Sequence, residues 1–177
     1  MSKENATLEE RLRNLAAPAI EARGLVLWGL EIATEGSAKI VRIFIDVPND
    51  SEQKGVTVDQ CAEVSRQAGL QFEVEDAVPG RYILEVSSPG IERRFFSLEQ
   101  TLPYIGQEID LRTFEPRDGR KHFKGVLKDA SLNARSLTLT ADPGPKAFDI
   151  EFGWDEIKKM KRIHRFHDAG GENGDTR

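Results

Sequence analysis

The chain has 177 residues and a formal net charge of −5, a length that suits one large domain or two small ones. Hydrophobic residues make up 38% and charged residues 31% of it, and no apolar run is long enough to span a bilayer or act as a signal region. These features predict a soluble cytoplasmic protein, and the single cysteine, Cys61, excludes an intrachain disulfide and a cysteine-rich metal site.

The charge is distributed unevenly between the two halves of the chain. Residues 1–90 carry 9 basic and 15 acidic side chains, a net charge of −6, whereas residues 91–177 carry 16 basic and 15 acidic side chains, net +1. The protein as a whole therefore does not attract RNA, and any contact with RNA must come from local basic patches. The acidic first half suits a basic protein partner better than a phosphate backbone.

The first half predicts alternating helices and strands. Residues 1–6 are expected to be disordered, and a helix is expected from a capping box with Thr7 as N-cap to Gly24. Alternating apolar residues then predict a strand in which Val26, Trp28, Leu30 and Ile32 share one face. A second alternating run, residues 41–47, predicts the next strand.

A second capping box, Thr57 to Gln60, begins another expected helix that ends near Gly69. The alternation of Tyr82, Leu84 and Val86 predicts a strand that completes an α-β-β-α-β order. Residues 7–90 are therefore expected to form an α+β domain with a three-stranded sheet and two helices.

The second half changes character. Residues 91–106 are expected to be a linker with at most a short helix, and residues 167–177 a disordered tail. Between them, residues 107–166 hold short alternating strands separated by turn clusters, a pattern that favours a small β-barrel. The expected strands are residues 109–113, 123–127, 137–139 and 148–152.

Catalytic and metal chemistry find little support in the sequence. Ser87 and Ser88 do not lie in a Gly-x-Ser-x-Gly turn, and all three histidines lie in the other half of the chain. The histidines lack the spacing of a metal pair, and phosphate-binding glycine loops are absent. The sequence therefore predicts no enzyme activity, no metal and no cofactor.

Two clusters of basic residues are candidates for contact with phosphate. Each could instead be a solvated strand face, and the sequence does not choose between these readings. Aromatic residues are not interleaved with the charges, so stacking on single-stranded bases has weak support. The first cluster comprises Arg112, Arg117, Arg120, Lys121 and Lys124. The second comprises Lys158, Lys159, Lys161, Arg162 and Arg165.

The most informative run is LEVSSPGIER, residues 84–93, a strand that stops at a Pro-Gly turn. Pro89 presets φ and Gly90 accepts a positive φ, as a type II turn requires. This run closely resembles the signature of the ribosome maturation factor RimP family. The resemblance continues in residues 25–32, 55–67, 74–80, 119–127 and 154–159, although Glu92 stands where the family usually has Asp and Arg94 where it usually has Pro.

The resemblance implies that the C-terminal barrel is SH3-like, and that its last strand lies within residues 158–166. Helical spacing of Ile157, Met160 and Ile163 is the alternative for this segment. If it is a strand, Lys159 and Lys161 share one face and Met160 points to the core between them.

The resemblance also implies a non-enzymatic assembly factor of the small (30S) ribosomal subunit. Its expected partners are free or immature small subunits, with their 16S rRNA and small-subunit proteins including protein twelve. The protein is expected to be a monomer without a membrane partner, and the alternative function is an Sm-like module that binds free RNA, which would require ring assembly. The residues expected to contact the subunit or a partner are Ser87, Ser88, Pro89, Gly90, Glu92 and Arg93. The residues expected to contact rRNA or a partner are Arg120, Lys121, Lys124, Lys159 and Lys161.

Overall fold

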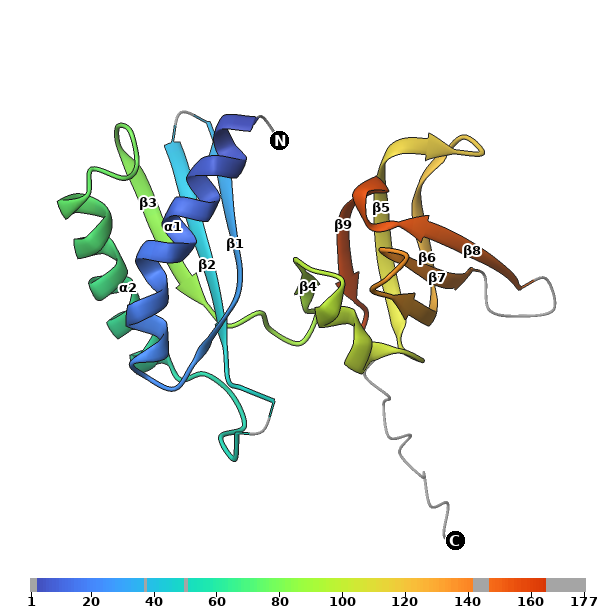
Figure 1. Cartoon of the computed structure of the whole chain (residues 1–177), viewed down its shortest axis with the longest axis horizontal. Coiled ribbons are helices and arrows are strands. Elements are labelled where there is room, and N and C mark those ends of the chain that lie inside the picture. The colour runs from blue at the N-terminus through green and yellow to red at the C-terminus, as the bar shows by residue number, and fades with distance from the viewer. Residues whose placement is uncertain (1–2, 37, 50, 142–146, 165–177) are drawn as a thin grey trace, which may run out of the picture. The chain divides into compact units, whose positions relative to one another are not determined.

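The computed structural model describes residues 3–36, 38–49, 51–141 and 147–164, with the side chains of residues 3–6 left aside. The chain divides into two compact units, an N-terminal unit of Met1–Gly90 and a C-terminal unit of Ile91–Arg177. Each unit has its own sheet, as Figure 1 shows, and each is described by itself.

The N-terminal unit is the α+β domain that the sequence predicts, with two helices over a three-stranded sheet (Figure 1). Strand β2 lies at the centre of the sheet, antiparallel to β1 and parallel to β3. The parallel pairing is possible because α2 forms the crossover between β2 and β3. The elements are α1 (Lys3–Glu21), β1 (Val26–Glu35), β2 (Ala38–Asp46), α2 (Val58–Val74) and β3 (Tyr82–Ser87).

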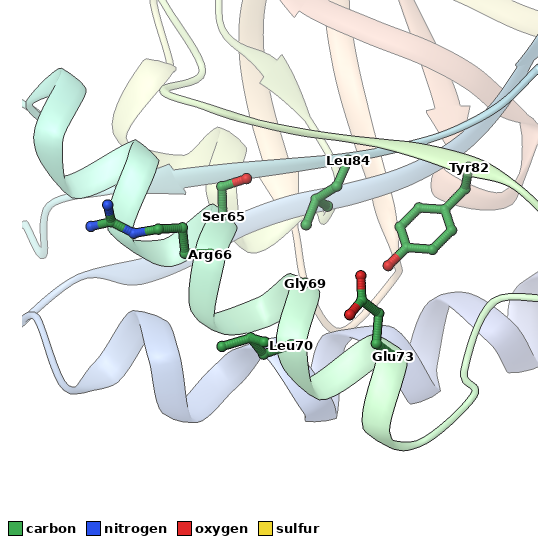
Figure 2. A pocket seen from close by; sticks show the side chains of 7 residues that line it. All are labelled: Ser65, Arg66, Gly69, Leu70, Glu73, Tyr82 and Leu84. Carbon is green, nitrogen blue, oxygen red and sulfur yellow. The ribbon is translucent and has the colours of Figure 1, made fainter.

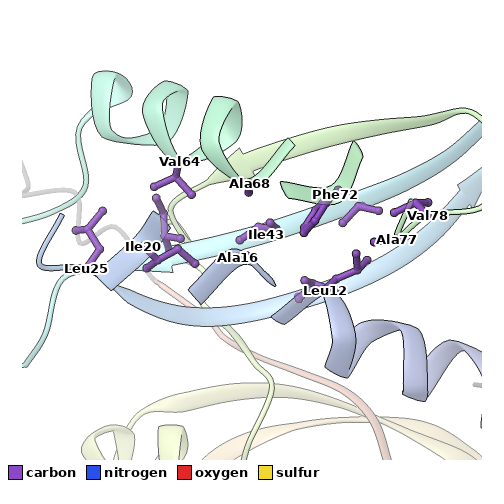
Figure 3. Packing of buried hydrophobic residues seen from close by; sticks show 13 residues of the cluster. Leu12, Ala16, Ile20, Leu25, Ile43, Val64, Ala68, Phe72, Ala77 and Val78 are labelled. Carbon is purple, nitrogen blue, oxygen red and sulfur yellow. The ribbon is translucent and has the colours of Figure 1, made fainter. Parts of the chain in front are cut away.

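One hydrophobic core lies between the two helices and the sheet, as Figure 3 shows. Leu12 and Ile20 of α1 and Phe72 of α2 all belong to this core, and all three are almost fully buried. Side chains at helical spacing on α1 and α2 and at alternate positions on β2 therefore enclose the same apolar layer.

Helix α2 begins at the predicted capping box. The backbone N–H of Gln60 donates to the Thr57 hydroxyl oxygen at 3.2 Å, and the Thr57 N–H donates to the Gln60 side-chain oxygen at 2.9 Å. The prediction for α1 is wrong in its start, because this helix already begins at Lys3. Thr7 therefore lies inside the helix, and residues 3–6, expected to be disordered, belong to its first turn. These residues contain neither Gly nor Pro to stop the helix.

A β-bulge changes which residues of β1 face the helices. The pairing with β2 runs from Leu27 opposite Ile45 to Gly29 opposite Phe44, so one extra residue lies in β1. A bulge reverses the alternation of faces. Leu27 and Leu30 consequently both pack on the core, whereas Val26 is 40% exposed, and the single face predicted for Val26 through Ile32 is wrong.

The C-terminal unit contains a six-stranded antiparallel sheet in the order β4-β9-β5-β6-β7-β8 (Figure 1). Among the described residues its hydrogen-bonded ladder ends at β4 and β8, so the pairing forms no closed barrel, in contrast to the expectation from the sequence. The strands are β4 (Arg94–Phe95), β5 (Glu108–Arg117), β6 (Arg120–Ser131), β7 (Ser136–Ala141), β8 (Phe148–Gly153) and β9 (Ile157–Arg162), with 3₁₀ helices η1 (Glu99–Tyr104) and η2 (Trp154–Glu156).

The segment expected to be a linker, residues 91–106, belongs to this unit. Within residues 91–106, β4 pairs with β9 and η1 follows it. Phe95 and Leu98 are buried, and the Phe95 ring packs edge-on against Tyr104 with their centroids 5.1 Å apart. The two-residue strand β4 is too short to produce an alternating pattern, which is why the sequence suggested a linker.

The closing segment is a strand, as predicted, rather than a helix. Met160 of β9 is 1% exposed and lies opposite Phe95 on one side and Leu111 on the other. The expected tail, residues 167–177, and the last two residues of the expected barrel, 165 and 166, lie outside the described residues. No helix in the described part of the chain is long and apolar enough to cross a membrane.

Candidate nucleic-acid interface

Four adjacent strands of the C-terminal unit bring basic side chains into register. Arg94 of β4 lies opposite Lys161 of β9, and Lys161 lies opposite Asp110 of β5. Asp110 in turn lies opposite Lys124 of β6. These pairings form a continuous row of charged residues across β4, β9, β5 and β6.

A second row lies beside the first. Lys159 of β9 is opposite Arg112 of β5, which is opposite His122 of β6. Side chains two residues apart on a strand share a face, so both rows project from the same side of the sheet. The intervening residues, including Leu111 and Met160, are buried on the other side.

We call this surface the basic face. Arg120 extends it, because it follows the same alternation along β6 and lines a hollow of about 320 Å³ with His122 and Lys124. The face unites parts of the two basic clusters that the sequence places some forty residues apart. Its basic members are Arg94, Arg112, Arg120, His122, Lys124, Lys159 and Lys161.

Two carboxylates partly balance the charge of the basic face. Asp110 lies 2.9 Å from the His122 Nε2 atom and 3.9 Å from the Lys124 ammonium, and its side chain is only 15% exposed. Glu92 accepts a hydrogen bond from the Lys161 ammonium. Cations outnumber these carboxylates, so the face keeps a positive excess that suits an anionic partner.

Repulsion within the basic face is visible at Lys159. Partial burial lowers the pKa of the Lys159 ammonium below its ordinary value. The neighbouring cations Arg94, Lys161 and Arg112 lower it further, and only Asp110 opposes them. The charged form of Lys159 therefore destabilises the folded state, and a bound phosphate would relieve that cost.

One of the five residues predicted to contact rRNA lies apart from the other four. Lys121 alternates with Arg120 and His122 along β6 and so points to the opposite side of the strand. Its ammonium donates to the backbone oxygen of Phe114 at 2.8 Å. Arg120, Lys124, Lys159 and Lys161 are brought together on the basic face, and Lys121 is not.

The six residues expected to contact the subunit at the strand-turn motif fall in both units. Ser87, Ser88, Pro89 and Gly90 end the N-terminal unit, where Gly90 has φ of +72° as the predicted turn requires. Glu92 and Arg93 begin the C-terminal unit, where the backbone N–H of Arg162 donates to the Arg93 oxygen at 2.8 Å. Glu92 thereby lies at the margin of the basic face.

The structure offers no alternative site for metal chemistry in the part of the chain it describes. No three His, Cys, Asp or Glu side chains there gather closely enough to hold a metal ion. Burial raises the pKa of the Cys61 thiol, so this residue is a poor nucleophile.

Comparisons with known proteins place the chain in a family. A family model described as the RimP N-terminal domain matches residues 15–92. Two curated proteins, both "Ribosome maturation factor RimP" from Nitratidesulfovibrio vulgaris strains DP4 and Hildenborough, are 40% identical over 168 residues. The alignments cover 92% of this chain and 94% of each relative. The chain belongs to the RimP family.

A third RimP protein, from Nitratidesulfovibrio vulgaris strain Miyazaki F, is 35% identical and is aligned over 94% of this chain and 88% of its own length. The family resemblance drawn from residues 84–93 is thus confirmed. Among solved structures, a chain of the MjSpt4:Spt5 complex is 13% identical, with a TM-score of 0.25 and a coverage of 88% of this chain and 92% of that chain.

Three members of the basic face in this RimP protein were not predicted as contact residues: Arg112, which belonged only to the first basic cluster, His122 and Arg94. The sequence suggested that His122 is a surface or core histidine and that Arg94 is part of a linker. Only the pairing of β4 with β9 and of β5 with β6 places them beside the lysines. Alternation of basic residues at 120, 122 and 124 was the one local signal that could have identified His122.

Proposed function

We propose that this RimP protein acts in the maturation of the small ribosomal subunit by binding free or immature small subunits in the cytoplasm, without catalysis. The observation that carries the proposal is the basic face, formed by four strands of a chain that belongs to a family of ribosome maturation factors. A broad cationic face that is built on paired strands fits the phosphates of structured rRNA better than other anions.

The net charge of the chain supports a local rather than a bulk attraction. Because the whole molecule carries −5, RNA is repelled from most of its surface and is attracted only where cations gather. A factor with a single cationic surface binds RNA through that surface, in one orientation, and does not bind in many copies along an RNA strand. This property suits an assembly factor better than a module that binds free RNA.

Binding alone is sufficient for the proposed action. A factor that binds an assembly intermediate more tightly than the finished subunit shifts the population of the folding rRNA toward the bound conformation. The same difference in affinity releases the factor from the mature particle. No bond needs to be made or broken.

We also propose contacts with ribosomal protein and a monomeric state for this chain. The strand-turn motif at Ser87–Gly90, with Glu92 and Arg93, is proposed to contact the subunit, and small-subunit protein twelve is the proposed protein partner. The acidic N-terminal unit suits a basic protein of this kind. The chain is proposed to act as a monomer.

The proposal is tested by sucrose-gradient sedimentation of tagged protein with purified small subunits, large subunits and complete ribosomes. We expect co-sedimentation with small subunits alone, and binding that weakens as salt is raised. Protein that remains at the top of the gradient at every salt concentration would exclude the proposed function. Light scattering of the free chain provides the second readout, since a six- or seven-membered ring would favour the Sm-like alternative.

Lys159→Gln should separate stability from binding. Because the folded-state pKa of Lys159 is depressed, its protonated form destabilises the folded state at neutral pH, and this cost is relieved as the pH rises through that pKa. Removing the charge should raise the Tm by about 1–3 °C, as expected for a surface charge change worth up to about 0.5 kcal/mol. It should also weaken binding to small subunits, by roughly threefold to tenfold at low salt.

Lys121→Gln is the matched control, because Lys121 alternates with Arg120 and His122 along β6 and lies outside the basic face. This variant should change neither the Tm nor the affinity. If Lys159→Gln lowers the Tm instead, the Lys159 charge stabilises the folded state. That result would contradict repulsion among the cations of the basic face.

A further inference from the structure

The N-terminal unit has a sheet edge that lacks the usual protection against pairing. Strand β3 lies at the end of the order β1-β2-β3, and no strand in the described part of the chain pairs with its outer edge. Such edges are ordinarily protected by lysine, proline or a bulge. Tyr82–Ser87 contains neither lysine nor proline, its one charged residue, Glu85, forms a salt bridge with Arg42 of β2, and its pairing with β2 is regular from end to end.

A groove runs along this free edge, between β3 and α2. Its volume is about 510 Å³, and Figure 2 shows Leu84 pointing from β3 toward Gly69 of α2. The absence of a side chain at Gly69 leaves the floor open, since a Cβ there would lie 3.6 Å from Leu84. Leu70 adds an apolar wall and is 56% exposed.

The two ends of the groove carry opposite charges. Arg66 lies toward one end, and Glu73 toward the other, where Figure 2 shows the Tyr82 hydroxyl directed at the Glu73 carboxylate. Neither Arg66 nor Glu73 forms a salt bridge within the described residues. They are seven residues apart on α2, a rise of about 10 Å.

We propose that β3 and α2 form a docking groove for an extended segment of a partner protein, which adds to the sheet as a fourth strand beside β3. Main-chain hydrogen bonds to the free edge supply affinity in this mode of recognition, and pockets for alternate side chains supply specificity. The segment presents an acidic, an apolar and a basic side chain at alternate positions. These span about 13 Å along a strand and reach Arg66, the Leu70–Leu84 floor and Glu73.

This proposal does not rest on the proposed contact with rRNA, because the groove and the basic face belong to different units. A result that excludes rRNA binding by the basic face therefore leaves the docking groove unaffected, and the reverse also holds.

The test uses the full chain and two capped, fluorescently labelled heptapeptides of opposite charge order. Their sequences are Thr-Glu-Thr-Leu-Thr-Lys-Thr and Thr-Lys-Thr-Leu-Thr-Glu-Thr. We expect saturable binding by fluorescence anisotropy with a preference for one order, and slower hydrogen exchange at the amides of residues 82–87. N-methylation of the peptide amides that face β3 should abolish binding, because it removes the donors of a strand ladder.

Three variants locate the binding site. Leu70→Asp should weaken binding about tenfold or more, equivalent to about 1.4 kcal/mol. Ile83→Asp is the matched control, since Ile83 is 50% exposed and alternates with the groove residues of β3, and it should bind within about twofold of the parent. Exchanging the charges with Arg66→Glu and Glu73→Arg should reverse the preference between the two peptides.

Four results would overturn the proposal. They are the absence of saturation by both peptides, equal binding of the N-methylated peptide, equal effects of the substitutions at Leu70 and Ile83, and a dimer of the chain that Leu70→Asp dissociates. The last result, read by light scattering, would assign the groove to a second copy of the chain.

Discussion

Met160→Asp should unfold the C-terminal unit and leave the N-terminal unit folded. Met160 is 1% exposed and packs between Phe95 and Leu111, so the new carboxylate would lose its hydration without gaining a partner. A cost of several kcal/mol is expected, a large part of the roughly 5–15 kcal/mol that stabilises a typical domain. The core of the N-terminal unit contains no residue of β9 and should be unaffected.

The two tryptophans allow each unit to be followed separately, because Trp28 lies in the first and Trp154 in the second. In a Trp28→Phe background, the Trp154 emission of Met160→Asp should be that of an unfolded chain at temperatures where the parent is folded. In a Trp154→Phe background, the Trp28 transition should not move. Met160→Leu, a change of similar volume, should cost less than about 1.5 kcal/mol.

A Met160→Asp protein whose Trp154 transition matches that of the parent would contradict the burial of Met160 between β4 and β5. It would also remove the basis for the basic face, because the orientation of Lys159 and Lys161 depends on the same alternation.

Lys124→Glu combined with Lys159→Glu should greatly weaken binding to the small subunit without unfolding the protein. Both side chains lie on the basic face, and Lys159 stands among three other cations, where a carboxylate is favoured. We expect a loss of affinity of about two orders of magnitude at low salt, since two attractive contacts with phosphate become repulsive. The slope of log affinity against log salt should become shallower by roughly two.

The matched control reverses two cations of the same unit outside the basic face, Lys121→Glu with Arg135→Glu. The net charge of both double variants is identical, so a field effect of the whole molecule would weaken both equally. Equal losses would show that the position of the charges is unimportant and would exclude the basic face as the contact surface. Thermal denaturation of both variants checks that the folds are retained.

Local sequence signals predicted the elements whose formation depends on neighbouring residues. The capping box of Thr57 and Gln60 was predicted because its two hydrogen bonds join residues three positions apart. The positive φ of Gly90 after β3 was predicted because glycine, which has no Cβ, adopts it without cost. The RimP resemblance was likewise contained in short runs of residues.

Signals that depend on pairing between distant strands were missed or misread. The bulge in β1 leaves no mark in the alternation of Val26, Trp28 and Leu30, because it arises from the register with β2. Strand β4 looked like a linker, because two residues show no period and only β9 defines them as a strand. The expected barrel closure depends in the same way on hydrogen bonds that the sequence does not specify.

The sequence by itself determined the helices and most strands, the burial of Met160 and the family, since these follow from periodicity, turn chemistry and short motifs. It also contained every charge of the basic face. Only the tertiary structure decided which charges act together, because antiparallel register places Arg94, Lys161, Asp110 and Lys124 in one row although β4 and β6 are far apart in the chain. Alternation then directs Lys121 away from that row, so Lys121 and Lys124 lie on opposite sides of one strand although they are only three residues apart.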